Sequence, residues 1–242
     1  MADTGTTDSV LKIEDQLARV SVGTIELMLE RIGYYNCFMV GVRPVTPAMH
    51  FVGRARTLRC LPVRPDVLEA RRKDALPNPH RVAIDGVSPG EVLVIDVRGS
   101  KESAVVGDLL ATRVKVAGGV AIVTDGCIRD SGEIAKLGLP VHSAGTNDTT
   151  FSSRFMGMDV NVPIACGGVL VLPGDYLVGD ADGVVVVPSS VVGKVAELSL
   201  EQEALDAFIR EKIEAGVPIA RAYPPDQELM EEYRRRKGQN NS

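Results

Sequence analysis

The stretch Gly107–Glu133, GDLLATRVKVAGGVAIVTDGCIRDSGE, contains a predicted helix, a predicted strand and a polar turn in direct succession. The composition of residues 107–117 predicts a helix, and two glycines separate it from an apolar run at 120–124. This run is short and rich in β-branched residues, so it predicts a strand that ends at the Asp125-Gly126 turn. The helix N-terminus and the carboxyl end of the strand can thereby lie close together in a mixed α/β fold.

Short apolar runs alternate with turn residues along most of the chain. They predict strands at 37–42, 51–61, 92–97, 141–144, 169–171 and 184–187. Turns are predicted where a glycine often needs a positive φ, at Asp85-Gly86, Pro89-Gly90, Pro173-Gly174 and Asp182-Gly183. Because these strands have few helices between them, the pattern indicates a layered α/β sandwich, and neither a doubly wound sheet nor a TIM barrel.

Further helices are predicted near both ends of the chain. Apolar residues at three- and four-residue steps between 9 and 31 predict two helices, with Asp8 as the N-cap of the first. Ser21 or Thr24 begins the second, and Gly33 ends it. Residues 132–137 and the amphipathic stretch 189–215 also predict helices. The segment 62–79, with four prolines and seven charges, predicts a loop or a short exposed helix.

Composition excludes several classes of function. The 242 residues carry a net charge of −5, and the longest basic run is Arg234–Lys237, so we expect no nucleic-acid partner. No apolar run approaches the roughly 18 residues of a membrane span, and the polar N-terminus lacks the features of a signal peptide. The four cysteines form no CxxC pair, which argues against a zinc knuckle or disulfide framework. We therefore expect a cytoplasmic protein that contacts no membrane.

Arg129 and Asp130 are the charged pair that follows the central strand. On a regular strand neighbouring side chains face opposite sides, so both can act in one site only on a loop or bulge. Arginine supplies a permanent planar cation for an oxyanion, and aspartate is a hard oxygen ligand for Mg²⁺ or Mn²⁺. The backbone amides of the first helical turn after Gly107 have no hydrogen-bond partners within the helix and could bind a carboxylate. A plain surface ion pair is the alternative for these two residues.

The order of these pieces resembles the signature of the RraA-like, 4-hydroxy-4-methyl-2-oxoglutarate aldolase family. The signature combines GDLLA at 107–111, Asp125-Gly126 and R-D-x-x-E at 129–133. The resemblance extends over roughly residues 17–216 through further short pieces, Gly41–Pro44, Gly53, Pro89–Asp96, Leu137–Pro140, Pro173–Asp175 and Asp180–Pro188. The segment 62–79 and the extension through Leu11 do not follow the family pattern.

For the fold, the resemblance implies an αββα sandwich similar to the phosphohistidine swivelling domain, flanked by N- and C-terminal helices. One domain would fill residues 1–242, with an extension at 1–11, helices at 12–33, the sandwich core at 34–188 and a C-terminal helix and tail at 189–242. Family members assemble as homotrimers or as dimers of trimers, which are homohexamers, with active sites at subunit interfaces. We expect the same assembly here.

For the activity, the resemblance implies a lyase: a class II aldolase that uses Mg²⁺ or Mn²⁺ to release pyruvate from a small 2-oxo acid, and that also decarboxylates oxaloacetate. Asp130 would bind the metal, largely through waters. Arg129 would contact the pyruvyl oxygens and stabilise the enolate, and Asp108 would orient a metal-bound water or take part in proton transfer. Gly107 and the amides of Leu109 and Leu110 would hold the substrate carboxylate.

Other residues have open roles. Glu133 either supports a metal-bound water or simply favours the dipole of the helix it begins. His50, His80 and His142 are isolated, which argues against a zinc hydrolase, although His142 could line the pocket. Lys115 lies in mid-helix and is a poor Schiff-base candidate. The loop residues Asn147, Asp148 and Arg154, and Glu201 and Glu203 of the long helix, could contact substrate or simply face solvent.

The alternative function belongs to a different class. Some members of the resembled family are regulators that bind and inhibit an RNA-degrading endonuclease, and such a protein would need no catalytic acids. An aldolase needs Asp130, Arg129 and an acid at position 108 together, and this sequence contains all three. The motif therefore favours the aldolase hypothesis.

Overall fold

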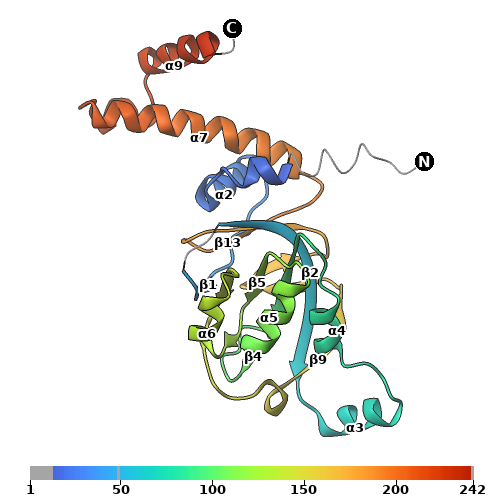
Figure 1. Ribbon diagram of the computed structural model, residues 1–242. Coiled ribbons are helices and arrows are strands. Elements are labelled where there is room, and N and C mark those ends of the chain that lie inside the picture. Colours follow the sequence, from blue (N-terminus) through green and yellow to red (C-terminus); the bar gives the residue numbers. More distant parts are fainter. Residues whose placement is uncertain (1–12, 48–49, 241–242) are drawn as a thin grey trace.

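An eight-stranded mixed sheet forms the centre of the molecule (Figure 1). The computed structural model describes residues 13–47 and 50–240, and within them the sheet has the order β1-β7-β5-β3-β2-β12-β13, with β9 also paired to β2. The strands are β1 Arg43–Pro44, β2 Phe51–Pro62, β3 Glu91–Asp96, β5 Ala121–Thr124, β7 Val141–Ser143, β9 Phe155–Val160, β12 Tyr176–Gly179 and β13 Val184–Val187. The long strand β2 pairs with β12 along its first residues and with β9 along its last ones.

The four strands β2, β3, β5 and β7 run parallel, and a helix lies between each consecutive pair. These helices are α4 Pro79–Asp85, α5 Asp108–Val116 and α6 Ser131–Lys136. All three pack on one face of the sheet, where Ile84, Val114 and Ile134 share a buried cluster with the strands. The helices cover one face only, so the prediction that the sheet is not doubly wound agrees with the structure. More helices separate the strands than the sequence indicated.

The opposite face of the sheet is covered by the hairpin of β10 Ile164–Cys166 and β11 Val169–Val171, together with Met39 and Val42. Because β3 and β5 are covered on both faces, nearly all of their residues are buried, which explains the continuous apolar runs at 92–95 and 121–123. The predicted mixed α/β class is thus confirmed. The closer similarity to the phosphohistidine swivelling domain stays a prediction, as does the division of the chain into a single domain.

A small parallel sheet lies at the end of β5 and positions the candidate site. It has the order β4-β6-β8 and consists of β4 Ala104–Val106, β6 Cys127–Ile128 and β8 Gly145–Thr146. A short 3-10 turn, η1 Phe151–Ser153, follows it. None of these pieces was predicted, because two or three residues show no periodicity and their pairing partners are distant in sequence.

Helices from both ends of the chain cover the β12–β13 side of the sheet (Figure 1). Residues 13–17 are helical, and α2 Val22–Arg31 follows, with the Ser21 hydroxyl accepting a hydrogen bond from the Thr24 amide as its N-cap. The predicted N-cap Asp8 lies outside the described residues. The long helix α7 Val192–Glu214 packs on α2 and then projects beyond the body with α8 Ile219–Ala222 and α9 Gln227–Asn240. Across the described residues, no helix has the length and apolar character that a bilayer crossing requires.

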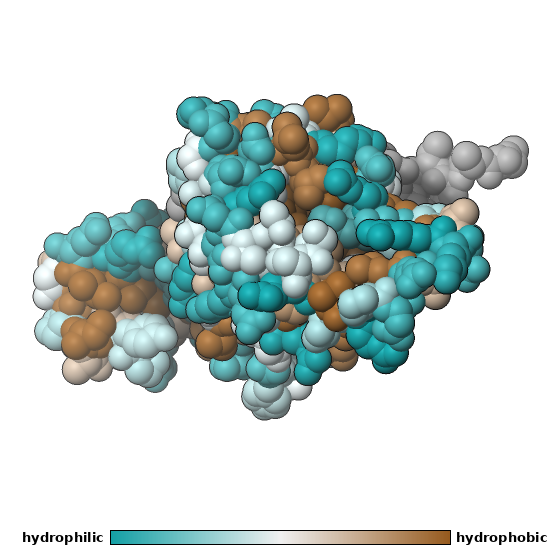
Figure 2. All heavy atoms as spheres, turned by 90° about the horizontal axis from the view of Figure 1, so that it is seen from below, coloured by the Kyte–Doolittle hydropathy of each residue, from teal (hydrophilic) through white to brown (hydrophobic). Residues whose placement is uncertain are grey.

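The projecting arm has its own apolar cluster, Phe208, Ile209, Ala222 and Leu229. Figure 2 shows this arm as a lobe beside the body, with apolar side chains gathered on it. The prediction of a helix over 189–215 is confirmed, whereas α8 and α9 were not predicted.

Two predictions about the strands and turns were wrong. Residues 37–42 do not form a strand, because Asn36 and Gly41 have left-handed backbones that interrupt extended pairing, and only Phe38 forms a bridge, with Val185. The Asp85-Gly86 pair is the end of helix α4 and not a turn between strands. The segment 62–79 contains the exposed helix α3 Pro65–Lys73, which agrees with its prediction.

Candidate functional site

The pairing of β4 with β6 brings the two halves of the motif together. Val106 at the end of β4 is the register partner of Ile128 at the end of β6, and the Arg129 amide donates to the Val106 carbonyl at 3.0 Å. Gly107 and Arg129 therefore directly follow the carboxyl ends of two neighbouring parallel strands, β4 and β6. This long-range contact, between residues separated by a whole helix and strand, creates the site.

The N-terminus of α5 presents backbone amides without intrahelical hydrogen bonds at this edge. Its first intrahelical hydrogen bond runs from the Ala111 amide to the Gly107 carbonyl, so the amides of residues 108–110 have no partner within the helix. Gly107 is the N-cap and offers no side chain to cap them. The predicted carboxylate site at Leu109 and Leu110 is thus available in the structure, as the positive end of a helix dipole.

Arg129 and Asp130 lie together at the start of α6. The Arg129 Nε is 3.3 Å from the Asp130 Oδ2, and both side chains are partly exposed. Asp130 has a left-handed backbone, with φ 56° and ψ 34°, which is uncommon for a residue with a side chain. Although Asp130 is the N-cap residue of α6, its carboxylate makes no capping hydrogen bond. The carboxylate thus contacts Arg129 and leaves its own helix uncapped, and left-handed residues of this kind are often found at functional sites.

Gly107 leaves room for this pair. A Cβ at position 107 would lie 2.7 Å from the Asp130 Oδ2 and 3.0 Å from the Arg129 Nε. The backbone of Gly107 is extended, with φ −117° and ψ −175°, so any residue could adopt it. A side chain at position 107 would thus displace the two charged side chains, whereas the backbone conformation itself does not need glycine.

A cavity of about 300 Å³ opens beside these groups. It is lined by five of the predicted residues, Gly107, Asp108, Leu109, Leu110 and Arg129. Asp130 is not part of the lining and lies behind it, against Gly107 and Arg129. The structure thus brings every predicted catalytic, substrate-binding and metal-binding residue to one cavity or to its immediate wall.

His80 also lines this cavity, although sequence reasoning assigned it no function. Its Nε2 lies 2.9 Å from the Val105 carbonyl, so this nitrogen donates, and its ring stacks on Phe151 with the centroids 4.3 Å apart. Burial lowers the pKa of His80, so its ring is neutral at physiological pH. The available sequence signal was local: Asn78 and Pro79 are a helix N-cap and a first-turn proline, and together they place His80 at the start of α4.

The fit to a divalent cation depends on one carboxylate. Within residues 13–47 and 50–240 no group of three or more His, Cys, Asp or Glu side chains is close enough to bind a metal together. Mg²⁺ commonly keeps several waters and binds proteins through one or two carboxylates, and the partly exposed Asp130 carboxylate matches that mode. The donor set therefore fits a largely hydrated Mg²⁺ or Mn²⁺, and does not fit a zinc site.

Glu133 does not face the cavity. Its Oε1 is 2.7 Å from the Lys136 Nζ within α6, and both side chains are well exposed. As an acidic residue in the first turn of α6, Glu133 favours the helix dipole. This geometry supports the structural alternative and gives no support to a role beside the metal.

Several of the remaining candidate side chains bind other parts of the protein. His142 is buried, with its Nε2 2.9 Å from the Asp180 carbonyl, and Lys115 donates to the Leu137 carbonyl. The Asn147 side chain holds its own loop through bonds to Lys101 and Thr149. Glu203 accepts hydrogen bonds from Ser21, and Glu201 pairs with Lys237. Neither His142 nor these other side chains line the candidate cavity.

Comparisons with known proteins agree with this geometry. The family model described as RraA-like (Aldolase/RraA) matches residues 12–186. A protein of Halalkalibacterium halodurans provisionally named 4-hydroxy-4-methyl-2-oxoglutarate aldolase is 39% identical over 137 residues, which are 56% of this chain and 64% of that protein. The match thus spans just under two thirds of the relative's length.

Solved structures resemble the whole body of the molecule. The crystal structure of Streptomyces coelicolor RraAS2, described as an unusual member of the RNase ES inhibitor RraA protein family, has a TM-score of 0.72 and 34% identity, and the match covers 82% of this chain and 96% of that one. An uncharacterised protein of Pseudomonas syringae has a TM-score of 0.79 at 24% identity, covering 88% of this chain and 93% of its own, which shows a common fold.

Proposed function

Because this chain belongs to the RraA-like (Aldolase/RraA) family, we propose that it is a divalent-metal-dependent class II aldolase. Its substrates are 2-oxo acids of the 4-hydroxy-4-methyl-2-oxoglutarate type, which it cleaves to pyruvate, and it also decarboxylates oxaloacetate. The observation that carries this proposal is the 3.3 Å distance between the Arg129 guanidinium and the Asp130 carboxylate. They lie beside the first-turn amides of α5, which have no partners within the helix. A helix N-terminus and a cation thus line one cavity, and a hard oxygen ligand lies beside the cation.

Charge development explains why these groups suit the reaction. Breaking the carbon–carbon bond leaves negative charge on the 2-keto oxygen of the departing pyruvate. Arg129, at the cavity wall, stabilises that charge, and the amides of Leu109 and Leu110 hold the substrate carboxylate. Asp108 lies in the same first turn and lines the cavity, and it would orient a metal-bound water or take part in the transfer of the substrate's hydroxyl proton. Oxaloacetate decarboxylation develops the same charge, so the same residues serve both reactions.

Asp130 is the residue that would hold Mg²⁺ or Mn²⁺ in this site. The cation supplies a second positive charge to the 2-keto oxygen when bound. Arg129 keeps the Asp130 carboxylate in place from one side, and Gly107 keeps the space beside it free.

The assembly is part of the proposal. Leu109 lines the cavity but is 79% exposed, and Val116 on the same helix is 75% exposed. Large exposed apolar side chains on one helix are a feature of surfaces that another subunit covers, although only Leu109 of the two lines the cavity. We propose that this surface lies in a homotrimer, or a dimer of trimers, in which a neighbouring subunit completes the site.

A second function has one specific observation in its favour. The chain is 34% identical to Streptomyces coelicolor RraAS2, a member of a family of RNase inhibitors. As such a regulator it would bind an endoribonuclease and would release no pyruvate. Asp108 and Arg129 line one cavity and Asp130 lies beside Arg129, and the presence of these three residues together favours the aldolase.

Pyruvate release tests the proposal directly. The purified protein is given 4-hydroxy-4-methyl-2-oxoglutarate or oxaloacetate with Mg²⁺, and pyruvate is measured against a protein-free blank. We expect release from both substrates, its loss with EDTA and its recovery with added Mg²⁺ or Mn²⁺. Asp130→Ala should abolish both activities, whereas Glu133→Gln, which removes the surface pair with Lys136, should keep them. An unchanged rate in Asp130→Ala would remove Asp130 from the mechanism.

A further inference from the structure

A second cavity lies beside the candidate site, against helix α3. It has a volume of about 210 Å³ and lies between α3, the chain before α4, η1 and the start of β9. Helix α3 belongs to the segment 62–79, which lies within the residues 12–186 that the family model matches but contains none of the short motifs that resemble the family signature. The α3 cavity is thus formed in part by residues outside those motifs.

The α3 cavity and the site cavity share part of their walls. Asn78, Phe151 and Ser152 line both of them. The Phe151 ring stacks on His80, which lines the site cavity only. A ligand held at the N-terminus of α5 can thus extend along the Phe151 wall into the α3 cavity.

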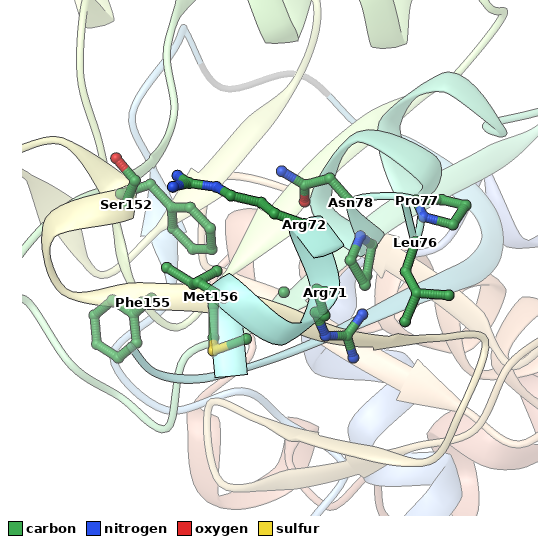
Figure 3. A pocket seen from close by; sticks show the side chains of 12 residues that line it. Arg71, Arg72, Leu76, Pro77, Asn78, Ser152, Phe155 and Met156 are labelled. Carbon is green, nitrogen blue, oxygen red and sulfur yellow. The ribbon is translucent and has the colours of Figure 1, made fainter. Parts of the chain in front are cut away.

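The lining of the α3 cavity combines an apolar surface with two cations. Leu68, Phe155 and Met156 supply apolar surface, and Arg71 and Arg72 supply positive charge. In Figure 3 the Arg72 side chain extends across the cavity toward Ser152, and the Asn78 amide lies near it. The cavity thus offers a charged, hydrogen-bonding rim above an apolar surface.

The acidic residues of α3 do not neutralise these arginines. Glu69 pairs with Lys73 at 3.0 Å, and Asp66 pairs with Arg64. Over the part of the chain that the structure describes, neither Arg71 nor Arg72 forms a salt bridge, and the Arg71 guanidinium contacts only the Met158 carbonyl, at 3.4 Å. Two cations without anionic partners at the edge of an apolar cavity are suited to a carboxylate at the end of a carbon chain.

We propose that the α3 cavity is the distal subsite of the aldolase site, and that it binds the far end of a 4-hydroxy-2-oxo acid that carries a chain of several methylenes ending in a carboxylate. The inference rests on the proposed function and narrows its substrate class. The 2-oxo acid end binds at α5 and Arg129, the methylenes lie along Phe151 and Met156, and the distal carboxylate binds Arg72 and Arg71. Oxaloacetate is too short to enter the α3 cavity.

An eight-carbon diacid is a suitable probe. In 4-hydroxy-2-oxosuberate the C4 hydroxyl loses its proton, the C3–C4 bond breaks, and its electrons form the enolate of pyruvate, which takes up a proton at C3. The products are pyruvate and 5-oxopentanoate. The monoacid 4-hydroxy-2-oxooctanoate has the same length and cleaves to pyruvate and pentanal, so it differs only at the distal end.

The experiment compares kcat/KM for the diacid, the monoacid and oxaloacetate, all with Mg²⁺. For the wild type we expect the diacid to exceed the monoacid by about tenfold or more, as for a charge-assisted contact to a carboxylate. Arg72→Ala should erase that preference and leave oxaloacetate decarboxylation within about twofold. Lys73→Ala removes one cation from the same helix outside the cavity, and should keep the preference. Thermal melting checks that each variant is folded.

Two results would overturn the subsite. The first is equal kcat/KM for the diacid and the monoacid in the wild type. The second is an Arg72→Ala variant that still prefers the diacid, or that loses activity toward the diacid and oxaloacetate equally. If no substrate yields pyruvate, the proposed function fails and the cavity is tested separately by calorimetric titration with suberate, a dicarboxylate that cannot react. Suberate binding that Arg72→Ala abolishes and Lys73→Ala retains supports a carboxylate subsite. Binding that is absent in the wild type, or unchanged in Arg72→Ala, overturns it.

Discussion

The Nε of Arg129 lies 3.3 Å from the Oδ2 of Asp130, although the two are chain neighbours that would face opposite sides of a regular strand. The left-handed backbone of Asp130, at the junction of β6 and α6, makes this approach possible. The same two side chains surround the position where a Cβ of residue 107 would lie. The site therefore depends on a local backbone distortion and on a long-range strand pair.

Arg129→Lys tests whether the planar guanidinium matters or only its charge. Lysine keeps the positive charge but lacks the fixed fork that holds Asp130 and contacts substrate oxygens. We expect kcat for pyruvate release to fall by about a hundredfold, because a contact to the developing charge is lost. Arg113→Lys on α5, where the arginine pairs with Asp85 away from the cavity, is the control and should change kcat little. Full activity in Arg129→Lys would show that charge alone is sufficient.

Gly107→Ala should damage the site without unfolding it. The added methyl group would lie 2.7 Å from the Asp130 Oδ2, so the carboxylate must shift from its position beside Gly107. The extended backbone at 107 accepts alanine, so we expect the melting temperature to change little while Mn²⁺ affinity, measured by electron paramagnetic resonance, and kcat both fall about tenfold or more.

Gly132→Ala is the matched control for this substitution. Gly132 lies in α6 close to the site, and a Cβ there would meet nothing within 4 Å. We expect wild-type metal affinity and activity in this variant. Equal effects of the two substitutions would contradict the role assigned to Gly107.

The sequence predicted those parts of the fold that are encoded locally. The helix over 107–117 and the strand over 120–124 each agree with the structure to within one residue at either end, because apolar pattern and glycines mark their bounds. β4, β6 and β8 were missed, because such short strands exist only through pairing with distant partners. The prediction of a strand at 37–42 was wrong for a related reason: Cys37, Met39 and Val42 are apolar because they are buried in the core, not because they form a strand.

The candidate site could be predicted only in part for the same reason. Asp108, Arg129 and Asp130 were identified because their order resembles a family signature, and the strand pairing that brings them together cannot be seen in the sequence. His80 was set aside as isolated, since its partner Phe151 belongs to a different part of the chain. The α3 cavity could not be predicted either. The sequence of segment 62–79 contains the cations Arg71 and Arg72, but it does not indicate that they face residues of η1 and β9.

Asp125 should make stability depend on pH. Burial raises its pKa from 3.8 to about 6, against the hydrogen bonds from Val97 and Gly99. The folded state therefore holds the Asp125 proton at pH values where the unfolded state has lost it. Its contribution to the free energy of unfolding is fully present below about pH 4 and is lost as the pH rises through about 6, by about 3 kcal/mol in total.

Urea unfolding of the wild type and Asp125→Asn at pH 4 and pH 7 isolates this contribution. Asparagine cannot ionise, so the variant removes the Asp125 titration, and Asp96 is the neighbouring carboxyl whose charge interacts with it. We expect the wild type to lose about 3 kcal/mol more than the variant between these two pH values. Parallel changes in both proteins would show that Asp125 does not titrate in this range.

Glu203→Ala distinguishes a structural role of this residue from a role in the site of a neighbouring subunit. The Glu203 Oε1 accepts hydrogen bonds from the Ser21 amide at 3.0 Å and the Ser21 hydroxyl at 2.8 Å, and so ties α7 to the start of α2. We expect the variant to lose about 1 kcal/mol in its free energy of unfolding, measured in urea, with kcat unchanged. Glu201→Ala, which removes an exposed pair with Lys237, should cost less than about 0.5 kcal/mol. A fall in kcat at unchanged stability would instead mean that Glu203 acts in catalysis across a subunit interface.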